Sequence, residues 1–322
     1  MRSMKFFLAG SVAAMIAMSL ARPALPQQPS AQQSDQGQVI KREVRLVNIL
    51  ASVRDKKKHM VTNLKQEDFH VFENDQEQKI AFFSNETTLP ITLGLLIDTS
   101  GSEQNRLPAE QGAASGFLQQ VMKNGDEAMV ISFDIDVDLL ADFTDDKAKL
   151  NRAINSARVN APNAPVTPGT FPSGPDGTHF YDAIYTACSD KLSSEAGRKA
   201  LVIVTDAEDF GSKVTVQEAI EAAERTDTVV HILLVHDPGY GTRPDIAKRI
   251  ADATGGRVID VSSMKHIREA FDQISEELRN QYTLGYYPTN GAPDGKFRKL
   301  KVEANDKDLH VLARKGYYAP RE

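Results

Sequence analysis

From Pro90 onward, continuous runs of apolar residues alternate with segments whose apolar residues recur at helical spacing. Such runs are typical of strands in a sheet that is covered by helices on both faces, because neither face then meets water. The runs are Ile91–Ile97, Ala128–Phe133, Ala200–Thr205, Val229–Val235 and Arg257–Val261. The sequence therefore predicts an α/β fold with a doubly wound, mostly parallel, Rossmann-like sheet.

Apolar stripes at helical spacing predict three helices that each turn one face to the core. The stripes are Ala114, Phe117, Leu118 and Val121; Phe180, Ala183, Ile184, Ala187, Cys188 and Leu192; and Ile267, Ala270, Phe271, Ile274 and Leu278. Cys188 is the only cysteine, and its place in a stripe predicts a buried, inert thiol. A short apolar run, Val137–Ala141, predicts an antiparallel strand at one edge of the sheet.

The two ends of the chain have period-two alternation instead, which predicts half-buried strands. The apolar residues in alternation include Val47, Ile49, Ala51 and Val53 near one end and Tyr282, Leu284 and Tyr286 near the other. Each end has too few strands to fold alone. We expect residues 39–88 and 281–322 to pair as one β-sandwich-like module, with the α/β domain, residues 89–280, inserted between its halves.

The N-terminus has the pattern of a secretory signal peptide. Arg2 and Lys5 precede an apolar run, Phe6–Leu20, that ends in small residues, which predicts a cleaved signal over residues 1–21. A membrane anchor is the alternative, but the run is shorter than the roughly 20 residues that span a bilayer. Residues 22–38 are rich in Gln and Pro and are expected to form a flexible leader. The mature protein is therefore expected in the periplasm or outside the cell, without a transmembrane segment.

Composition and charge exclude several classes of function. The chain of 322 residues is 41% hydrophobic and 25% charged, with a formal charge of −6, which is typical of a globular protein rather than a disordered one. A net acidic chain without a long Lys/Arg run is not expected to bind nucleic acid. No HExxH zinc motif or Walker loop is present.

Oxygen-bearing side chains follow three elements of the predicted sheet domain. Asp98, Ser100 and Ser102 come directly after the first strand, Thr178 opens a helix, and Asp206 ends a later strand. The carboxyl edge of an open α/β sheet is where ligands bind. Because all five side chains are hard oxygen donors, they suit one divalent cation, Mg²⁺ first and Mn²⁺ or Ca²⁺ as alternatives, rather than zinc or copper.

These residues resemble the metal-ion-dependent adhesion site of von Willebrand factor type A domains. The Asp-x-Ser-x-Ser motif is Asp98–Ser102, the Gly-Thr element is Gly177-Thr178, and the strand-end aspartate is Asp206. The resemblance covers about residues 89–280. It implies that the serine hydroxyls contact the metal directly, that the threonine joins in some conformations, and that the aspartates act partly through water. It also implies a protein partner whose Asp or Glu carboxylate completes the coordination, hence adhesion-type binding rather than catalysis.

Two residues depart from the pattern of this family, and four are predicted to line the rim of the site. Glu103 stands where methionine is common, and Ala207 where glycine is common. Neither change removes a ligand, although Glu103 adds negative charge. The predicted partner-binding rim consists of Glu103, His179, Asp209 and His236.

The flanking strands also resemble the exported type A-related proteins of Acidobacteria. The similar segments are Val61–Leu64, Tyr282–Pro288 and Ala313–Tyr318. This resemblance supports the architecture and the metal, and it names no partner.

Two other functions remain open. The protein could be a structural or assembly module of the cell envelope whose metal site is idle. A phosphatase of the haloacid-dehalogenase type is a remote alternative, in which Asp134 and Asp136 imitate the nucleophile motif and Asp206 and Asp209 the metal-binding acids. That fold needs a lysine at a strand end between these motifs, which the sequence does not offer, so a solvated turn is the preferred interpretation of Asp134 and Asp136.

Overall fold

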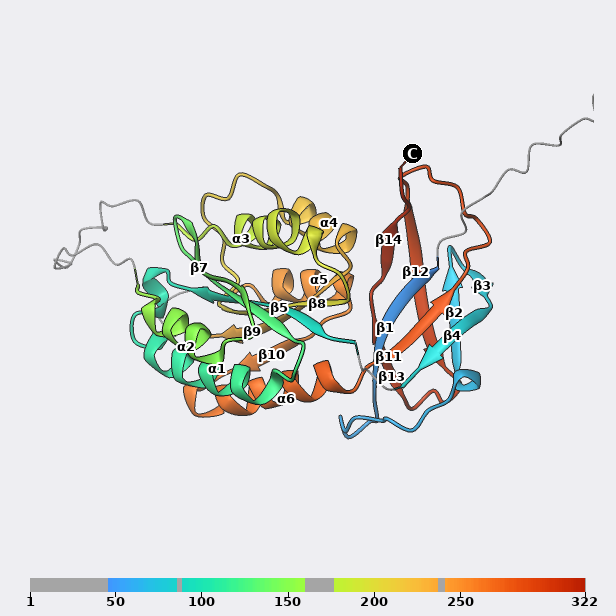
Figure 1. Ribbon diagram of the computed structural model, residues 1–322, viewed down its shortest axis with the longest axis horizontal. Helices are drawn as coiled ribbons and strands as arrows, with labels where there is room; N and C mark the ends of the chain where they lie inside the picture. Colours follow the sequence, from blue (N-terminus) through green and yellow to red (C-terminus); the bar gives the residue numbers. More distant parts are fainter. Residues whose placement is uncertain (1–45, 86–88, 160–176, 237–240, 322) are drawn as a thin grey trace, which may run out of the picture. The chain divides into compact units, whose positions relative to one another are not determined.

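A six-stranded sheet forms the centre of the α/β domain in the computed structural model (Figure 1). The structure describes residues 46–85, 89–159, 177–236 and 241–321. The sheet order is β10-β9-β8-β5-β6-β7, and every neighbouring pair is parallel except β6 and β7. The strands are β5 (Ile91–Asp98), β6 (Glu127–Phe133), β7 (Val137–Thr144), β8 (Arg198–Thr205), β9 (Thr228–Val235) and β10 (Val258–Val261). The doubly wound, mostly parallel sheet and its antiparallel edge strand are thus confirmed.

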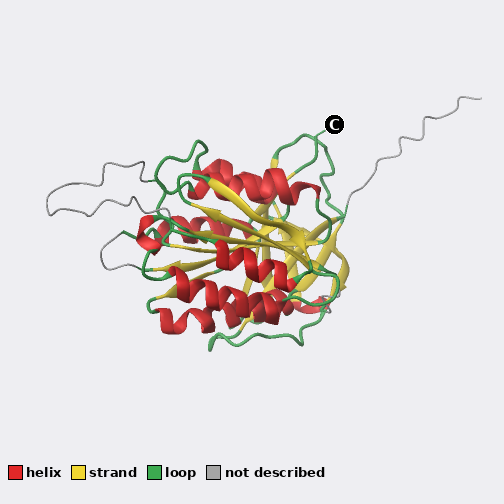
Figure 2. Cartoon of the chain, turned by 60° about the vertical axis from the view of Figure 1, so that its left-hand side comes forward, coloured by secondary structure: helices red, strands yellow, loops and turns green. Residues whose placement is uncertain are grey.

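Helices cover both faces of this sheet (Figures 1 and 2). One face packs on α1 (Leu107–Val121), α2 (Lys147–Ser156) and α6 (Ile267–Arg279), and the other on α3 (Phe180–Thr186), α4 (Val216–Arg225) and α5 (Pro244–Thr254). Short helical turns complete the set: η1 (Gln66–Asp68), η2 (Gly101–Glu103), η3 (Ala187–Lys191), η4 (Leu192–Ser194) and η5 (Met264–His266). The predicted stripes lie in α1, in α3 with the turns that continue it, and in α6. Cys188 is fully buried, and burial raises the pKa of its thiol to about 12, as expected for an inert thiol.

Two four-stranded sheets form the β-module, which we define as β1–β4 and β11–β14. Their orders are β13-β1-β11-β4 and β14-β12-β2-β3. The strands are β1 (Val47–Arg54), β2 (Phe69–Glu73), β3 (Gln76–Gln78), β4 (Ile80–Ser84), β11 (Tyr282–Tyr286), β12 (Phe297–Ala304), β13 (His310–Ala313) and β14 (Gly316–Tyr318). Because β1 pairs with β11 and β13, and β2 pairs with β12, each sheet contains strands from both sides of the α/β domain.

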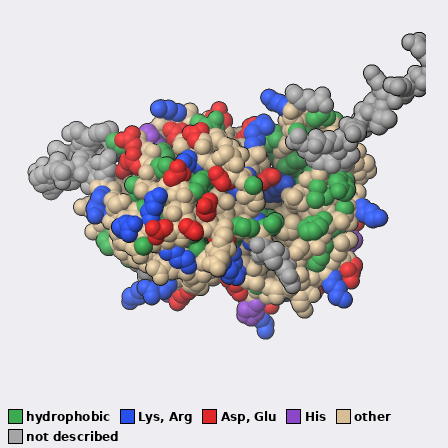
Figure 3. All heavy atoms as spheres, viewed as in Figure 1, with side chains coloured by type: hydrophobic (Ala, Val, Ile, Leu, Met, Phe, Trp, Pro, Cys, Tyr) green, Lys and Arg blue, Asp and Glu red, His purple; other side chains and the backbone are tan. Residues whose placement is uncertain are grey.

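The inward faces of the β-module carry the alternating apolar residues that the sequence predicted, such as Ile49, Val53 and Leu284. Some large apolar side chains of the module remain in water, and Tyr287 is 55% exposed. On the face drawn in Figure 3, apolar side chains gather over the β-module, whereas charged side chains of both signs cover much of the α/β domain. Among the described residues, no helix is both long and apolar enough to cross a membrane. The predicted signal peptide and leader lie outside the described residues.

A buried carboxylate joins the β-module to the last helix of the α/β domain. Glu277 of α6 accepts hydrogen bonds from Ser52 and from Arg54 of β1, and the Arg54 Nη2 to Glu277 Oε2 distance is 2.8 Å. Arg257 adds a second ion pair at 3.1 Å. Burial alone would raise the pKa of Glu277, but the Ser52 hydrogen bond and the nearby cations hold it below its ordinary value.

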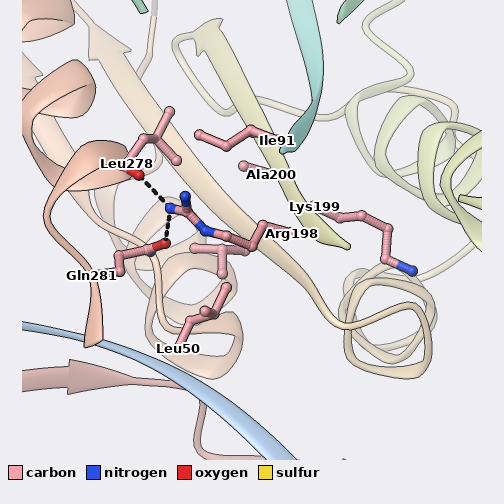
Figure 4. Close-up of a pocket in the computed structure, with 8 residues that line it drawn as sticks. Leu50, Ile91, Arg198, Lys199, Ala200, Leu278 and Gln281 are labelled. Atoms are coloured by element: carbon pink, nitrogen blue, oxygen red, sulfur yellow. Dashed lines mark hydrogen bonds between the residues drawn. The ribbon is translucent and has the colours of Figure 1, made fainter. Parts of the chain in front are cut away.

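A small cavity at the amino ends of β5 and β8 lies at the opposite edge of the sheet from Asp98 and Asp206. Figure 4 shows Arg198 in it, with Nη2 donating to the Leu278 carbonyl oxygen and to Gln281 Oε1, the latter at 2.6 Å. Its volume is about 10 Å³, which is room for about one water molecule. This cavity therefore supports no ligand site.

Candidate metal site

The predicted ligands lie at the point where the sheet changes its winding direction. β5 lies between β8 and β6 in the sheet. The strands that directly follow it in the chain, β6 and β7, extend the sheet on one side, and the later strands β8, β9 and β10 extend it on the other. Asp98 is the last residue of β5, and Asp206 directly follows β8. Loops at such a switch point diverge and leave room for a ligand at the carboxyl edge.

Asp98 is fixed by hydrogen bonds on both carboxylate oxygens. Oδ1 accepts from the Ser100 main-chain N–H at 2.9 Å, and Oδ2 accepts from the Thr205 hydroxyl at 2.7 Å. The same Thr205 oxygen accepts from the main-chain N–H of Ala207 at 3.0 Å. Short polar side chains that bind nearby backbone in this way set the course of a loop, so β5 and β8 fix the start of each ligand loop.

The two serines link Asp98 to the second aspartate. Ser100 Oγ and Ser102 Oγ are 3.1 Å apart, and Ser102 Oγ donates to Asp206 Oδ2 at 3.0 Å. Asp206 Oδ1 also accepts from the Glu208 N–H at 3.0 Å. All four predicted ligands in this network are buried, with at most 8% of each residue exposed. The structure therefore brings four of the five predicted ligands together.

Thr178, the fifth predicted ligand, is buried beside the loop that follows β8. Its main chain forms a two-way bridge with Phe210, with N···O distances of 3.1 and 2.9 Å. Within the described ranges, its hydroxyl takes no part in the hydrogen bonds that join the other four ligands. The loop after β8 thus holds Thr178 in place through this bridge. The role of Thr178 as a metal ligand stays a prediction.

Negative charge accumulates in this network. Burial raises the pKa of Asp98 to about 8, and the nearby carboxylates of Glu103 and Asp206 contribute to this rise. The carboxyl group therefore holds its proton at neutral pH unless a cation offsets the charge. A divalent ion at this place would favour the ionised form.

The donor set fits a small divalent cation. Adjacent ligands of an octahedral Mg²⁺ at 2.0–2.1 Å lie about 3 Å apart, which matches the oxygen spacing along Ser100, Ser102 and Asp206. Within the described part of the chain, no group of three or more His, Cys, Asp or Glu side chains is arranged to hold a metal. The candidate site differs from such a group because it combines two carboxylates with several hydroxyls. All of these are hard oxygen ligands, some anionic and some neutral.

The segment that contains this network matches a known family. Residues 93–208 match the family model described as the von Willebrand factor type A domain. This segment is similar to a type A domain. Domains of this family often mediate adhesion between proteins and are typically interaction modules rather than enzymes.

Solved structures with a similar fold include other type A domains. The chain is 12% identical to a type A protein from Catenulispora acidiphila, with a TM-score of 0.50, covering 78% of this chain and 72% of that one. It is 18% identical to the conserved hypothetical protein BatB from Bacteroides thetaiotaomicron, with a TM-score of 0.45, covering 58% and 98%. For proximal thread matrix protein 1 from the mussel byssus, solved with a zinc-occupied MIDAS motif, the identity is 15% and the TM-score 0.49, covering 63% and 48%. No curated protein matches the chain.

Glu103 does not lie on the rim of the candidate site, which corrects the prediction from the sequence. Its side chain is fully buried beneath the serine loop. Arg106 Nε donates to Glu103 Oε2 at 3.1 Å, and Arg106 Nη2 donates to the Ser102 carbonyl oxygen at 2.8 Å. Burial and the neighbouring carboxylate of Glu110 raise the pKa of Glu103. The guanidinium of Arg106 offsets part of the cost of burying the Glu103 carboxyl group.

The other three predicted rim residues are engaged in local contacts. Asp209 Oδ1 accepts from the Tyr181 N–H at 3.1 Å and so caps the start of α3. His179 packs closely on Gly211, where an added Cβ would lie 2.8 Å from its Nε2. His236 contacts the edge strand β10, away from the ligand network, because its Nε2 is 2.9 Å from Asp260 Oδ2. Only His179 and Asp209 therefore belong to the loops around the network.

The structure adds two features of the loop after β8 that the sequence did not predict: the exposure of Phe210 and the backbone conformation of Ala207. Phe210, which bridges Thr178, is 62% exposed and adds an apolar side chain at the edge of the site. Ala207 has a left-handed backbone with φ of 62° while fully buried. Glycine adopts this conformation without steric cost, unlike alanine. Alanine in place of glycine at position 207 therefore constrains the backbone of the loop that follows Asp206.

The acids of the phosphatase alternative do not meet in one site. Asp134 follows β6 and Asp206 follows β8, and β5 separates these strands. Asp134 Oδ2 accepts from the Thr99 hydroxyl at 2.9 Å, whereas Asp206 Oδ2 accepts from Ser102. The geometry therefore gives no support to that reaction.

Proposed function

We propose that this protein is an exported, divalent-cation-dependent protein-binding module. The cation would be held by Asp98, Ser100, Ser102, Thr178 and Asp206 and would accept an Asp or Glu carboxylate of a partner protein. The observation that carries the proposal is the run of oxygens from Ser100 through Ser102 to Asp206, with steps of 3.1 and 3.0 Å. Asp98 lies beside this run, because its Oδ1 accepts from the Ser100 main-chain N–H at 2.9 Å.

The charge balance of the donor set favours this function. When bound, a divalent cation supplies an electrophilic centre for an incoming carboxylate. Asp98 and Asp206 roughly neutralise its charge, while the direct contacts from Ser100 and Ser102 are neutral and leave it attractive to a further anion. An all-oxygen set supports Mg²⁺, with Mn²⁺ or Ca²⁺ as alternatives.

The proposed export rests on the sequence of residues 1–21, where two basic residues precede an apolar run and small residues. The absence of a second cysteine is compatible with any compartment.

Capture of partners from the native cell envelope tests the proposal. The full chain is used as bait in Mg²⁺ and again in chelator, and Asp98→Asn serves as a second bait. We expect partners that are present with wild type in Mg²⁺ and absent both with chelator and with Asp98→Asn. The asparagine keeps the shape of the buried side chain, so its fold should persist, and circular dichroism checks this.

A structural or assembly module with an idle metal site is the second candidate. One observation favours it: both aspartates already accept hydrogen bonds from side-chain hydroxyls, Asp206 from Ser102 and Asp98 from Thr205. A set of partners that is identical in Mg²⁺, in chelator and with Asp98→Asn would support this function and contradict the first.

A further inference from the structure

A pocket of about 300 Å³ lies beside the proposed metal site, and its lining is acidic. It is formed where β5 ends, where β6 turns into β7, and where α2 ends. Asp134, Asp136 and Asp138 all line it. The volume is at the lower end of the range for ligand pockets, about 300–1,000 Å³, and far exceeds that of a bare metal ion.

Three aspartates outnumber the one cation, Arg158, among the described residues that line this pocket. Among the described residues, none of the three aspartates forms an ion pair. Within the same part of the chain, the Asp134 side chain accepts only from the Thr99 hydroxyl, at 2.9 Å, and from the Asp136 main-chain N–H, at 3.2 Å. Arg158 also lines the pocket, but its Nη1 donates to two main-chain carbonyl oxygens near the end of α2.

A buried serine in the same wall has a hydroxyl without a partner among the described residues. Ser132 of β6 lines the pocket and is 7% exposed. Its hydroxyl makes no hydrogen bond with the part of the chain that the structure describes. The serine oxygen is accessible from the pocket rather than sealed in the core, so it is available to accept an N–H from a ligand.

The pocket adjoins the proposed metal site at Thr99. Thr99 lines the pocket and lies between Asp98 and Ser100 in the chain. One ligand could therefore reach both places. A metal at the ligand network attracts an anion, while the pocket attracts a cation.

The lining of the pocket suits an organic cation better than a metal ion. The described residues contain no group of three acidic side chains that converge on a metal. A guanidinium or ammonium group instead satisfies dispersed carboxylates, because its N–H donors point in several directions. Ser132 and Asp134 supply acceptors at the inner end, and Asp136 and Asp138 supply charge at the exposed end.

We propose that the pocket of Thr99, Ser132, Asp134, Asp136 and Asp138 binds a Lys or Arg side chain of the partner protein. This inference rests on the proposed function, since the same partner supplies the carboxylate for the metal. The recognised segment of the partner then carries a basic residue close to an acidic one.

Nuclear magnetic resonance titration with blocked single amino acids tests the pocket without any metal. The full chain in chelator is titrated with Nα-acetyl-arginine methylamide and with its neutral analogue Nα-acetyl-citrulline methylamide. We expect saturable shifts for arginine and none for citrulline. Asp136→Asn with Asp138→Asn, and separately Ser132→Ala, should weaken arginine binding by about fivefold or more, the loss of one or more hydrogen bonds.

Asp145→Asn is the matched control, because Asp145 is exposed and lies outside the pocket lining. It should bind arginine like wild type. Equal shifts for arginine and citrulline, or unchanged arginine binding in the double variant, would overturn the inference. Because this titration contains no metal, its outcome is separate from the metal-dependent capture that tests the proposed function.

A second arm asks whether one partner segment uses both places. Peptides with one Asp and one Arg at varied spacing are compared in Mg²⁺ with matched peptides that carry citrulline. Tighter binding of some arginine peptides, lost in Asp136→Asn with Asp138→Asn, supports the inference. Equal binding of both sets to wild type contradicts it.

Discussion

Arg106 donates from Nε to Glu103 Oε2 at 3.1 Å, and both side chains are buried directly beneath the serine loop of the proposed metal site. The same guanidinium donates to the carbonyl oxygen of Ser102. Glu103, which was predicted to lie on the rim, thus supports the site from within the protein. Its charge acts on Asp98 rather than on a partner protein.

Removal of this support should destabilise the fold. In Arg106→Gln, Glu103 and Glu110 would stay buried without their cation, and breaking a buried ion pair costs about 3 kcal/mol or more. Urea unfolding followed by circular dichroism measures the loss. Arg249→Gln, which removes a surface arginine whose guanidinium donates to Gln217, should change stability by less than about 0.5 kcal/mol. A loss for Arg106→Gln no larger than for the control would contradict the account.

The metal-free protein should lose stability as the pH rises from about 6.5 to 8. Asp98 has a pKa of about 8 when folded against an ordinary 3.8, so the folded state holds a proton that the unfolded chain has released. Stability therefore falls while the pH rises between these values. The buried His231, with a pKa lowered to about 4, has the opposite effect only below its ordinary value of 6.5.

Urea unfolding in chelator at pH 6.5 and 8 checks this prediction. Asp98→Asn should have a smaller difference between the two pH values than wild type, because the amide that replaces the carboxyl group has no proton to lose in this range. With Mg²⁺ present the wild-type difference should shrink, since the cation favours the ionised carboxylate. Wild-type stability that rises between pH 6.5 and 8 in chelator would count against the buried, protonated Asp98.

The contact between the β-module and α6 should depend on the carboxylate of Glu277. Glu277→Gln removes the charge that Arg54 and Arg257 share, and we expect a loss of about 3 kcal/mol because both cations then lose their buried counter-charge. Differential scanning calorimetry measures it. Glu276→Gln is the control: its side chain is 50% exposed and 3.7 Å from Arg54, so its effect should stay below about 1 kcal/mol. Similar melting curves for the two variants would refute the role of Glu277.

The strands of the α/β domain were predictable because buried parallel strands have continuous apolar runs. β9, for example, was predicted to begin at Val229 and begins at Thr228. The pairing of the chain ends was predictable from alternation in β1 and β11. Helices α2, α4 and α5 were not predicted individually, because alanines such as Ala153, Ala219 and Ala247 form much of their buried faces and give a weak stripe.

Four of the predicted metal ligands are joined in the structure because strand ends fix their positions in advance. Positions on the loops could not be predicted in the same way. The burial of Glu103 depends on Arg106, three residues later on the same turn, and this spacing was the available signal. The acidic pocket depends on how α2 ends beside β6 and β7, which no local pattern encodes.

Titration of the metal-stripped full chain with Mn²⁺ tests the central claim most directly, with electron paramagnetic resonance reporting free Mn²⁺ and Mg²⁺ added as competitor. We expect one saturable site in wild type and in the control Asp145→Asn. Binding should be about tenfold weaker or more in Asp98→Asn and Ser102→Ala, since each removes one ligand oxygen. Equal Mn²⁺ affinity in wild type and Asp98→Asn would contradict the site.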